Sequence, residues 1–437
     1  NFAAVPDAAA AVRALLDHFA FAAPWADREG DARRVGDAIA RAWAEGEAPH
    51  VLEALEVLDP VFYRRKGAYL VGRARGGNRV MPLLLALVHD AGGIRVDAAL
   101  LTEDEVSVVF SFTRSYFRAD IPCPTDAIEF LRTLMPLKPV FELYTALGHH
   151  KHGKTEFYRA LQRHLMRTSE KFVRTPGVPG MVMEVFALPT FEAVFKVIRD
   201  EFPPPKHLTP SEVRRRYRMV FAHDRAGRLV DAQEYVGLAF PRDRFAPALL
   251  AELLETAGRG VRVEEDRVVI AHLYAERKVR PLDLYMDESP PAAGVAAALD
   301  YGQAIRDLAS TGIFPGDLLP KNFGVTRSGR VVFYDYDELR LLEECRFRDL
   351  PEPRNPEEEL ADEPWFHVGP NDVFPRDLAR FVPFSGAARA AYLTAHGHIY
   401  ETGYWRDLQA RQGAGEVVDI YPYGANRRLT SGSSAPR

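Results

Sequence analysis

The spacing of apolar residues predicts that the chain begins with helices and then turns to strands. Apolar positions recur at helical intervals over three early segments, 8–20, 35–44 and 51–58. The period then changes to two, and Gly76-Gly77-Asn78 between two alternating runs is typical of a β-hairpin. The strands expected here are 68–74, 79–88, 94–101 and the alternating positions Val106, Val108, Phe110 and Phe112. Helical spacing returns over 127–135 and 155–168.

The second part of the chain mixes the two patterns. Apolar runs at 181–188 and 194–199 flank Pro189-Thr190 and predict two antiparallel strands. Thr209-Pro210-Ser211-Glu212 predicts a helix start, because Thr209 can cap the helix and Glu212 can close a capping box. The remaining elements expected are strands at 261–269 and 271–275, a long helix at 295–308, and a hairpin formed by 323–325 and 331–334. These patterns predict an α+β protein whose mainly helical N-terminal part carries a small antiparallel sheet.

Composition excludes several classes of protein. The chain has 437 residues, of which 47% are hydrophobic and 27% charged, which is ordinary for a globular protein of two or three domains. Its longest apolar run, 80–88, is far shorter than the ~20 residues of a membrane helix, so no membrane partner is expected. A formal charge of −5 provides no basic field for nucleic acid. Cys123 and Cys345 are expected to be reduced thiols in a cytoplasmic protein.

Two segments are expected to lie outside the packed core. From 338 to 363 the chain has ten acidic and four basic residues together with several prolines, which predicts a surface segment. The last residues, 426–437, are rich in Ser and Arg and are expected to be disordered.

The spacing of three polar residues points to phosphoryl transfer. Asp317 is followed five residues later by Asn322, which is the spacing of the catalytic loop of protein kinases. The hairpin that follows ends at Asp335, 18 residues after Asp317. Phosphoryl transfer needs a base beside the attacking hydroxyl, and oxygen ligands for Mg²⁺. We therefore predict that Asp317 is the base and that Asn322 and Asp335 bind the metal.

A kinase also needs a lysine and a flexible loop for the phosphates of ATP. Lys196 stands within an apolar run, where burial is costly unless a partner such as a phosphate is present. Upstream, two glycines three residues apart let backbone N–H groups approach phosphate oxygens. The predicted nucleotide loop consists of Thr175, Pro176, Gly177, Val178, Pro179, Gly180 and Met181.

The motifs depart from those of eukaryotic protein kinases, which leaves alternatives open. Asp317 follows Pro-Gly and not His-Arg, and Asp335 begins Asp-Tyr-Asp and not Asp-Phe-Gly. Each motif alone also occurs by chance; their conjunction and order favour a divergent phosphotransferase. A small-molecule kinase of the aminoglycoside or choline type shares this Asp/Asn spacing. A nucleotide-sensing pseudokinase scaffold is the alternative from a different class.

Longer stretches resemble one known family, the bacterial isocitrate dehydrogenase kinase/phosphatases. The resemblance is dense from 180 to 375 and extends from about 62 to 423. The matching stretches include Gly312-Ile313-Phe314-Pro315-Gly316-Asp317, Gly329-Arg330-Val331-Val332-Phe333-Tyr334-Asp335-Tyr336-Asp337-Glu338, Val194-Phe195-Lys196-Val197-Ile198 and Asp372-Val373-Phe374-Pro375. It implies a bilobal kinase-like domain with ATP and Mg²⁺ as cofactors (Mn²⁺ as an alternative), and AMP as an allosteric effector. The implied activity is phosphorylation and dephosphorylation of a serine of isocitrate dehydrogenase, which switches carbon between the citric acid cycle and the glyoxylate bypass.

The resemblance also implies roles for individual residues. It assigns the loop from Thr175 to Met181 and Lys196 to ATP, Asp317 to the base, and Asn322 and Asp335 to the metal. Asp231 matches an aspartate that the family treats as an active-site residue, although its flanking residues differ here.

Some neighbouring residues are open to more than one interpretation. Asp337 would share a strand face with Asp335, and we hypothesise that it biases the site toward phosphatase and ATPase activity; the alternative is a hydrogen-bonded surface aspartate. Glu212 is a weak candidate for the partner of Lys196, and 276–279 is where a hinge would bind adenine. Solvated surface clusters are the favoured interpretation of two groups: His149, His150 and His152, and Arg214, Arg215, Arg216 and Arg218.

We expect the chain to consist of a regulatory domain over 1–170, a catalytic domain over 171–425 and the disordered tail over 426–437. The chain begins at Asn1 and lacks about one small domain of the family's N-terminal region, so truncation of the regulatory domain is expected.

Overall fold

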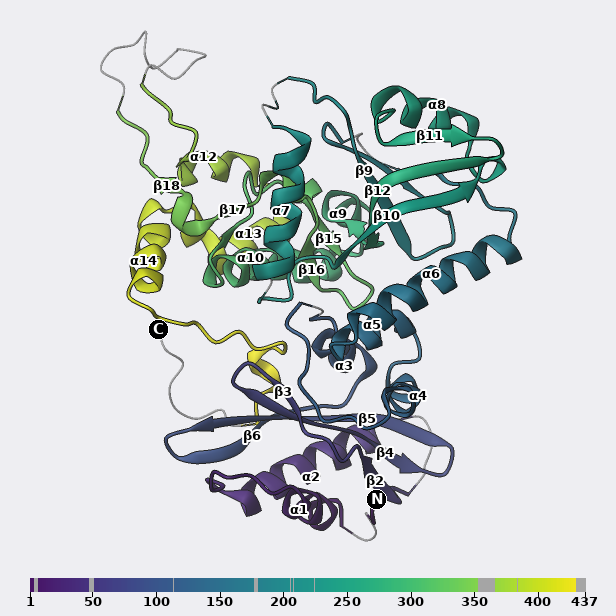
Figure 1. The fold of residues 1–437 in the computed structure, drawn as a ribbon. Helices are drawn as coiled ribbons and strands as arrows, with labels where there is room; N and C mark the ends of the chain where they lie inside the picture. Colours follow the sequence, from purple (N-terminus) through teal and green to yellow (C-terminus); the bar gives the residue numbers. More distant parts are fainter. Residues whose placement is uncertain are drawn as a thin grey trace. The chain divides into compact units, whose positions relative to one another are not determined.

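The computed structural model describes residues 1–3, 7–46, 51–112, 114–176, 180–204, 206, 208–223, 225–352, 366–382 and 384–429. By its internal contacts the chain divides into two units, one formed by 1–160 with 421–437 and the other by 161–420. Figure 1 shows both units, and each is described by itself.

The first unit is built on an antiparallel sheet of six strands, in the order β1-β2-β4-β5-β6 with β3 paired to β4. The strands are β1 (Phe2–Ala3), β2 (Ala54–Val57), β3 (Phe62–Arg64), β4 (Gly67–Gly76), β5 (Arg79–Asp90) and β6 (Gly93–Leu100). The helices are α1 (Ala8–His18), α2 (Arg28–Ala44), α3 (Glu103–Val109), α4 (Pro124–Leu134), α5 (Val140–Ala146) and α6 (His150–Arg167), whose end belongs to the second unit.

Helices cover this sheet on both faces (Figure 1). Leu83 and Leu85 of β5 join the core formed with α1 and α2, whereas Leu84 joins the core formed with α3, α4 and α5. Because β5 is buried on both faces, its side chains do not alternate between apolar and polar. This explains the continuous apolar run at 80–88.

Two expectations for this unit are wrong. Residues 51–58 were expected to be helical but contain strand β2, which pairs with β4. The alternating positions from Val106 to Phe112 do not form the expected strand, because Val106 and Val108 lie in helix α3 and Phe110 is its C-cap. That helix has a capping box in which Thr102 and Glu105 satisfy each other's backbone N–H groups. Pairing with β4 determines the secondary structure of the first segment and the capping box that of the second, and both outweigh the spacing of apolar residues.

The end of the chain packs on the first unit. Arg428 makes an ion pair with the buried carboxylate of Asp97 at 2.9 Å, and the Tyr423 hydroxyl donates to the same carboxylate at 2.9 Å. The expected disorder therefore does not apply to 426–429, and the rest of the predicted tail lies outside the described residues.

The second unit begins with another antiparallel sheet of six strands, in the order β10-β12-β9-β8-β7 with β11 paired to β12. The strands are β7 (Val173–Arg174), β8 (Met183–Ala187), β9 (Ala193–Ile198), β10 (Ala232–Pro241), β11 (Val261–Glu264) and β12 (Arg267–Arg277). Helix α7 (Pro210–His223) follows β9, and helix α8 (Pro247–Thr256) follows β10. The expected capping box at Thr209 and Glu212 is present, with Thr209 N donating to Glu212 Oε2 at 2.7 Å.

The rest of this unit is mainly helical, with short strands. Its helices are α9 (Leu282–Glu288), α10 (Pro291–Ser310), α12 (Pro375–Leu378), α13 (Gly386–His396) and α14 (Thr402–Gly413). Its strands are β13 (Arg280–Pro281), β14 (Ile313–Phe314), β15 (Phe323–Val325), β16 (Val331–Phe333), β17 (Arg340–Leu341), β18 (Arg346–Phe347) and β19 (Asp372–Val373). None of the described helices is long and apolar enough to cross a membrane.

One buried arginine joins the segment before β10 to α10 and β16. Arg228 donates from Nε to Asp307 at 2.7 Å and from Nη1 to Asp300 at 2.7 Å. Its Nη1 also donates to the carbonyl of Val331, whose N–H donates to Asp300. The hairpin strand β16 is therefore fixed to the long helix through the buried Arg228 and the partly buried carboxylate of Asp300.

We predict that Arg228→Met destabilises the second unit. Removing one partner leaves Asp300 and Asp307 without their cation, and breaking a buried ion pair costs about 3 kcal/mol of unfolding free energy. Urea unfolding followed by circular dichroism measures the loss. Arg262→Met is the matched control, because the Arg262–Glu264 pair is exposed and contributes under ~1 kcal/mol. Equal effects of the two substitutions would contradict the role given to Arg228.

Candidate active site

Lys196 is held in a buried ion pair on the sheet of the second unit. Its Nζ lies 2.8 Å from Oε2 of Glu276 on β12, and both side chains are almost fully buried. The same Nζ donates to the carbonyl of Tyr334 at 2.9 Å. Burial raises the pKa of Glu276, while Lys196 and the Tyr217 hydroxyl, which donates to Oε1 at 3.0 Å, act to lower it. Lys196 is thus fixed between the sheet and the end of the catalytic hairpin.

The partner of Lys196 differs from the weak candidate that the sequence offered. Glu212 is occupied at the N-terminus of α7, where it accepts from Thr209. Glu276, expected only to begin a hinge, supplies the carboxylate. In the sheet Lys196 stands opposite Tyr274, so Glu276, two residues further along β12, lies on the same face.

Asp317 and Asn322 are brought together by a strained loop before η2 (Pro320–Asn322). Asn322 Nδ2 donates to Oδ1 of Asp317 at 2.6 Å, and the N–H of Leu319 donates to the same oxygen at 3.1 Å. Gly316 has φ +86° and Leu318 has φ +53°, a conformation that costs a non-glycine residue about 1 kcal/mol or more. Burial raises the pKa of Asp317. Backbone strain of this kind is concentrated at functional sites, where contacts with the surrounding structure maintain it.

The hairpin of β15 and β16 delivers Asp335 beside this loop. The strands pair in register from Phe323 with Phe333, as the sequence predicts. Directly after them, the N–H of Tyr334 donates to the carbonyl of Asn322 at 3.0 Å. Asp335 therefore directly follows Tyr334, whose backbone is hydrogen-bonded to the catalytic loop.

Asp335 and Asp337 form a coupled pair of buried carboxyl groups. Burial and the neighbouring charge of Asp337 raise the pKa of Asp335 well above its ordinary value. For Asp337, burial acts to raise the pKa, but hydrogen bonds with Asp335 and Lys206 lower it overall. The expected strand geometry is wrong, because Tyr336–Glu338 is a 3₁₀ turn (η3). The two carboxyl groups nevertheless lie within hydrogen-bonding reach of each other.

Lys206 binds the far side of this pair. Its Nζ lies 2.7 Å from Oδ2 of Asp337 and also contacts the carboxylate of Glu338. Although burial acts to lower the pKa of Lys206, these two carboxylates raise it. Lys206 stays charged, and the local excess of negative charge is reduced.

Asp231 lies at the start of β10, close to the Lys196–Glu276 pair. The segment before it runs beside β16, where the N–H of Val230 donates to the carbonyl of Phe333 at 3.0 Å. The following residue, Ala232, stands opposite Glu276 in the sheet. The charge of Asp231 contributes to raising the pKa of Glu276.

The predicted nucleotide loop connects β7 and β8. Thr175 donates from its backbone N–H and its hydroxyl to the carbonyl of Val185, at 3.2 and 3.3 Å. A Cβ at Gly180 would lie 2.9 Å from the carbonyl of Met183, so only glycine fits there without a shift. Pro176 and the partly exposed Met181 are described, whereas Gly177, Val178 and Pro179 lie outside the described residues.

The residues around Asp335 fit a hard divalent cation. If Asp335 and Asp337 are both ionised, the buried Oδ1 of Asp337 has no hydrogen-bond donor among the described residues. A proton shared between the two carboxyl groups, or a bound cation, would satisfy this oxygen. Asn322 and Asp335 provide an amide and a carboxylate oxygen, and Mg²⁺ typically takes one or two carboxylates and keeps several waters. In the described part of the chain, no group of three or more His, Cys, Asp or Glu side chains could hold a metal.

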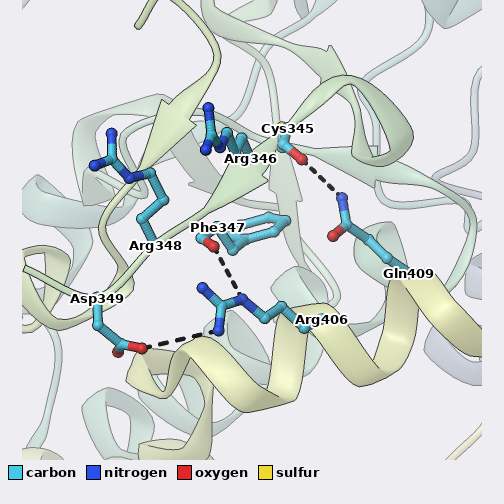
Figure 2. Close-up of a pocket in the computed structure, with 7 residues that line it drawn as sticks. All are labelled: Cys345, Arg346, Phe347, Arg348, Asp349, Arg406 and Gln409. Carbon is cyan, nitrogen blue, oxygen red and sulfur yellow. Dashed lines mark hydrogen bonds and ion pairs between the residues drawn. The ribbon is translucent and has the colours of Figure 1, made fainter. Parts of the chain in front are cut away.

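A separate pocket of about 530 Å³ contains none of these residues (Figure 2). It is lined by Cys345, Arg346, Phe347, Arg348, Asp349, Arg406 and Gln409. Two of its arginines bind the protein itself: Arg406 Nε donates to the carbonyl of Phe347 at 3.0 Å, and Arg348 pairs with Asp372. This pocket is basic, but these guanidinium groups support the fold.

Lys206 and Arg228 are not predicted by the sequence as contributors to this site, and Glu276 is expected there only as the start of a hinge. Glu276 and Lys206 depend on partners that are 80 and 131 residues away along the chain. Lys206 follows a run of prolines and Arg228 follows a glycine, and neither sequence context indicates a role for the residue.

Comparison with known proteins is consistent with this geometry. The order of loop, lysine strand, helix, Asp/Asn loop, hairpin and aspartate defines a protein-kinase-like domain. A family model for the isocitrate dehydrogenase kinase/phosphatase (AceK) kinase domain matches residues 170–425, and one for the AceK regulatory domain matches residues 1–169. The chain therefore belongs to the isocitrate dehydrogenase kinase/phosphatase family.

Individual relatives agree. The isocitrate dehydrogenase kinase/phosphatase of Anaeromyxobacter sp. (strain Fw109-5) is 52% identical over 423 residues, which are 97% of this chain and 74% of the relative. The protein of that name from Anaeromyxobacter dehalogenans (strain 2CP-C) is 51% identical over 421 residues, 93% of this chain and 71% of the relative. Among solved structures, the ROP18 kinase domain in complex with AMP-PNP and sucrose covers 59% of this chain and 92% of its own. It has 15% identity and a TM-score of 0.28, which is too low to carry an argument.

We predict that Glu276→Gln weakens the use of ATP. Glutamine keeps the shape and the contact with Tyr217 but removes the charge that orients Lys196, so KM for ATP should rise about tenfold, equivalent to ~1.4 kcal/mol. Steady-state kinetics with varied ATP measure the change. Glu264→Gln, on exposed β11, is the control and should leave KM unchanged. An unchanged KM in Glu276→Gln would show that the ion pair does not orient Lys196 for nucleotide.

Proposed function

We propose that this chain transfers the γ-phosphoryl group of ATP to a serine of isocitrate dehydrogenase and also removes that phosphate. The observation that carries the proposal is the meeting of Asp317 and Asn322 at 2.6 Å, beside the hairpin that ends at Asp335. Membership of the family supplies the protein substrate, and the kinase-like domain supplies ATP as the donor.

In the phosphorylation step, Asp317 accepts the proton of the serine hydroxyl. Its Oδ1 is occupied by Asn322 and Leu319, so Oδ2 is the oxygen that remains for substrate. Burial raises the pKa of Asp317, so its carboxylate is a stronger base than that of an exposed aspartate. Lys196 and the loop from Thr175 to Met181 bind the phosphates of ATP in this proposal.

A divalent cation completes the kinase site in this proposal. Mg²⁺, or Mn²⁺ in its place, supplies positive charge that screens the transferring phosphoryl group. Asn322 and Asp335 would hold it, as the amide and carboxylate chemistry of the described site allows. These ligand roles rest on residue chemistry and on the contacts around Asp335.

In the dephosphorylation step, Asp337 orients water toward the phosphoserine. Hydrogen bonds with Asp335 and Lys206 lower its pKa, which favours the carboxylate form that accepts a hydrogen bond from water. Asp231, near Glu276, is the second acidic residue that the proposal places in this step. The exchange of phosphate would switch carbon between the citric acid cycle and the glyoxylate bypass, with AMP as an effector of the balance.

Incubation with purified isocitrate dehydrogenase, Mg²⁺ and γ-labelled ATP tests the proposal. We expect label on a serine of the dehydrogenase, loss of the dehydrogenase's activity, and later release of the label. Asp317→Asn should slow phosphorylation by roughly 10²–10⁴-fold, whereas Asp266→Asn, in the exposed turn before β12, should not. Label on a small alcohol, or ATP binding without transfer, would overturn the proposal.

We predict that Asp337→Ala separates the two activities. Alanine removes the carboxylate that orients water but leaves Asp317 and Asn322 in place. Phosphatase and ATPase rates should therefore fall by about tenfold or more, and the kinase rate by much less. The ratio of the two rates on the same preparation is the measurement. A proportional loss of both activities would show that Asp337 serves the site as a whole.

A further inference from the structure

Two cations and three carboxyl groups meet beside η3, in a cluster that the reaction scheme above uses only in part. Lys206 and Arg216 provide the positive charges and act on Asp337 and Glu338, and Asp335 shares a hydrogen bond with Asp337. Arg216 extends from α7, and its buried Nη1 has no hydrogen-bond partner among the described residues. Its guanidinium interacts electrostatically with Glu338 and Asp337.

Lys206 makes direct contact with this cluster. Its ammonium group lies 2.7 Å from Oδ2 of Asp337 and contacts Glu338, and only 15% of its side chain is exposed. Glu338 in turn packs against the catalytic loop, because a Cβ on Gly316 would lie 2.6 Å from the Cβ of Glu338. Lys206 therefore connects the segment after β9 to both the carboxylate pair and the loop of Asp317.

The two oxygens of Asp337 are made unequal by this contact. Oδ2 is bound by Lys206, whereas the buried Oδ1 has no donor among the described residues apart from the hydrogen bond that Asp337 shares with Asp335. A carboxylate fixed at one oxygen cannot rotate freely, so the other oxygen keeps one direction. That is the property required of a group that must aim a water molecule at phosphorus.

We propose that Lys206 is a positioning residue for the phosphatase reaction, holding Asp337 so that Oδ1 faces the reacting water. The proposal rests on the proposed function and deepens it. Lys206 itself touches neither substrate nor nucleotide in this scheme, and it acts through Asp337. The kinase step, which depends on Asp317, needs Lys206 less.

Substitution of Lys206 tests the proposal. In Lys206→Met, which keeps the length of the side chain and removes its charge, we expect the phosphatase kcat to fall roughly tenfold to a hundredfold. The KM for phosphorylated isocitrate dehydrogenase should be unchanged, and the kinase kcat should change by less than about threefold. Lys206→Arg, which keeps the charge, should recover part of the phosphatase rate. Lys171→Met, at an exposed position before β7, is the matched control.

A double substitution distinguishes positioning from general damage. If Lys206 acts only through Asp337, Lys206→Met combined with Asp337→Ala should be no slower as a phosphatase than Asp337→Ala alone. Binding of a non-hydrolysable ATP analogue, measured by titration calorimetry with Mg²⁺, should stay within about twofold of the unmodified chain and so show that the site remains folded.

The outcomes separate this proposal from the broader one. Equal losses of kinase and phosphatase activity in Lys206→Met, an unchanged phosphatase rate, or additive effects in the double variant would each overturn the role of Lys206 alone. An unmodified chain that phosphorylates isocitrate dehydrogenase but never releases the phosphate would overturn the phosphatase half of the proposed function and, with it, this proposal.

Discussion

Three buried carboxyl groups, those of Glu276, Asp335 and Asp337, impose the main electrostatic constraint on the second unit. Burying a charge without a partner costs several kcal/mol. Lys196 therefore pairs with Glu276, Lys206 pairs with Asp337, and Asp335 between them has a strongly raised pKa. Lys196 on β9 also donates to the carbonyl of Tyr334, so this bond and the Lys206–Asp337 pair connect β9 and the segment after it to the end of the catalytic hairpin.

The catalytic loop depends on this hairpin being held in one place. Leu318 keeps a left-handed backbone, and its carbonyl accepts a bond from the buried Tyr301 hydroxyl of α10. The same helix supplies Asp300, which binds both Arg228 and the N–H of Val331. The strain at Leu318 is therefore maintained by contacts with a long, buried helix, and the loop has little freedom to relax away from Asn322.

The sequence predicts the parts of the site that are close together along the chain. Asp317, Asn322 and the hairpin before Asp335 lie within one short stretch, where spacing alone determines which side chains meet. The partner of Lys196 could not be predicted in this way, because Glu276 reaches it only through the register of β9 with β12. In the first unit, β2 and α3 were mistaken for a helix and a strand, since sheet pairing and a capping box outweighed the apolar period.

The position of Glu276 has a consequence for control of the enzyme. In protein kinases the glutamate that pairs with this lysine lies on the helix after the lysine strand, and movement of that helix breaks the pair. Here both partners belong to neighbouring strands of one sheet, and helix α7 contacts the glutamate through the Tyr217 hydroxyl. A shift of α7 would remove that hydrogen bond without separating Lys196 from Glu276. The same shift would move Arg216 relative to Asp337 and Glu338, so α7 is better placed to act on the carboxylate cluster than on the lysine.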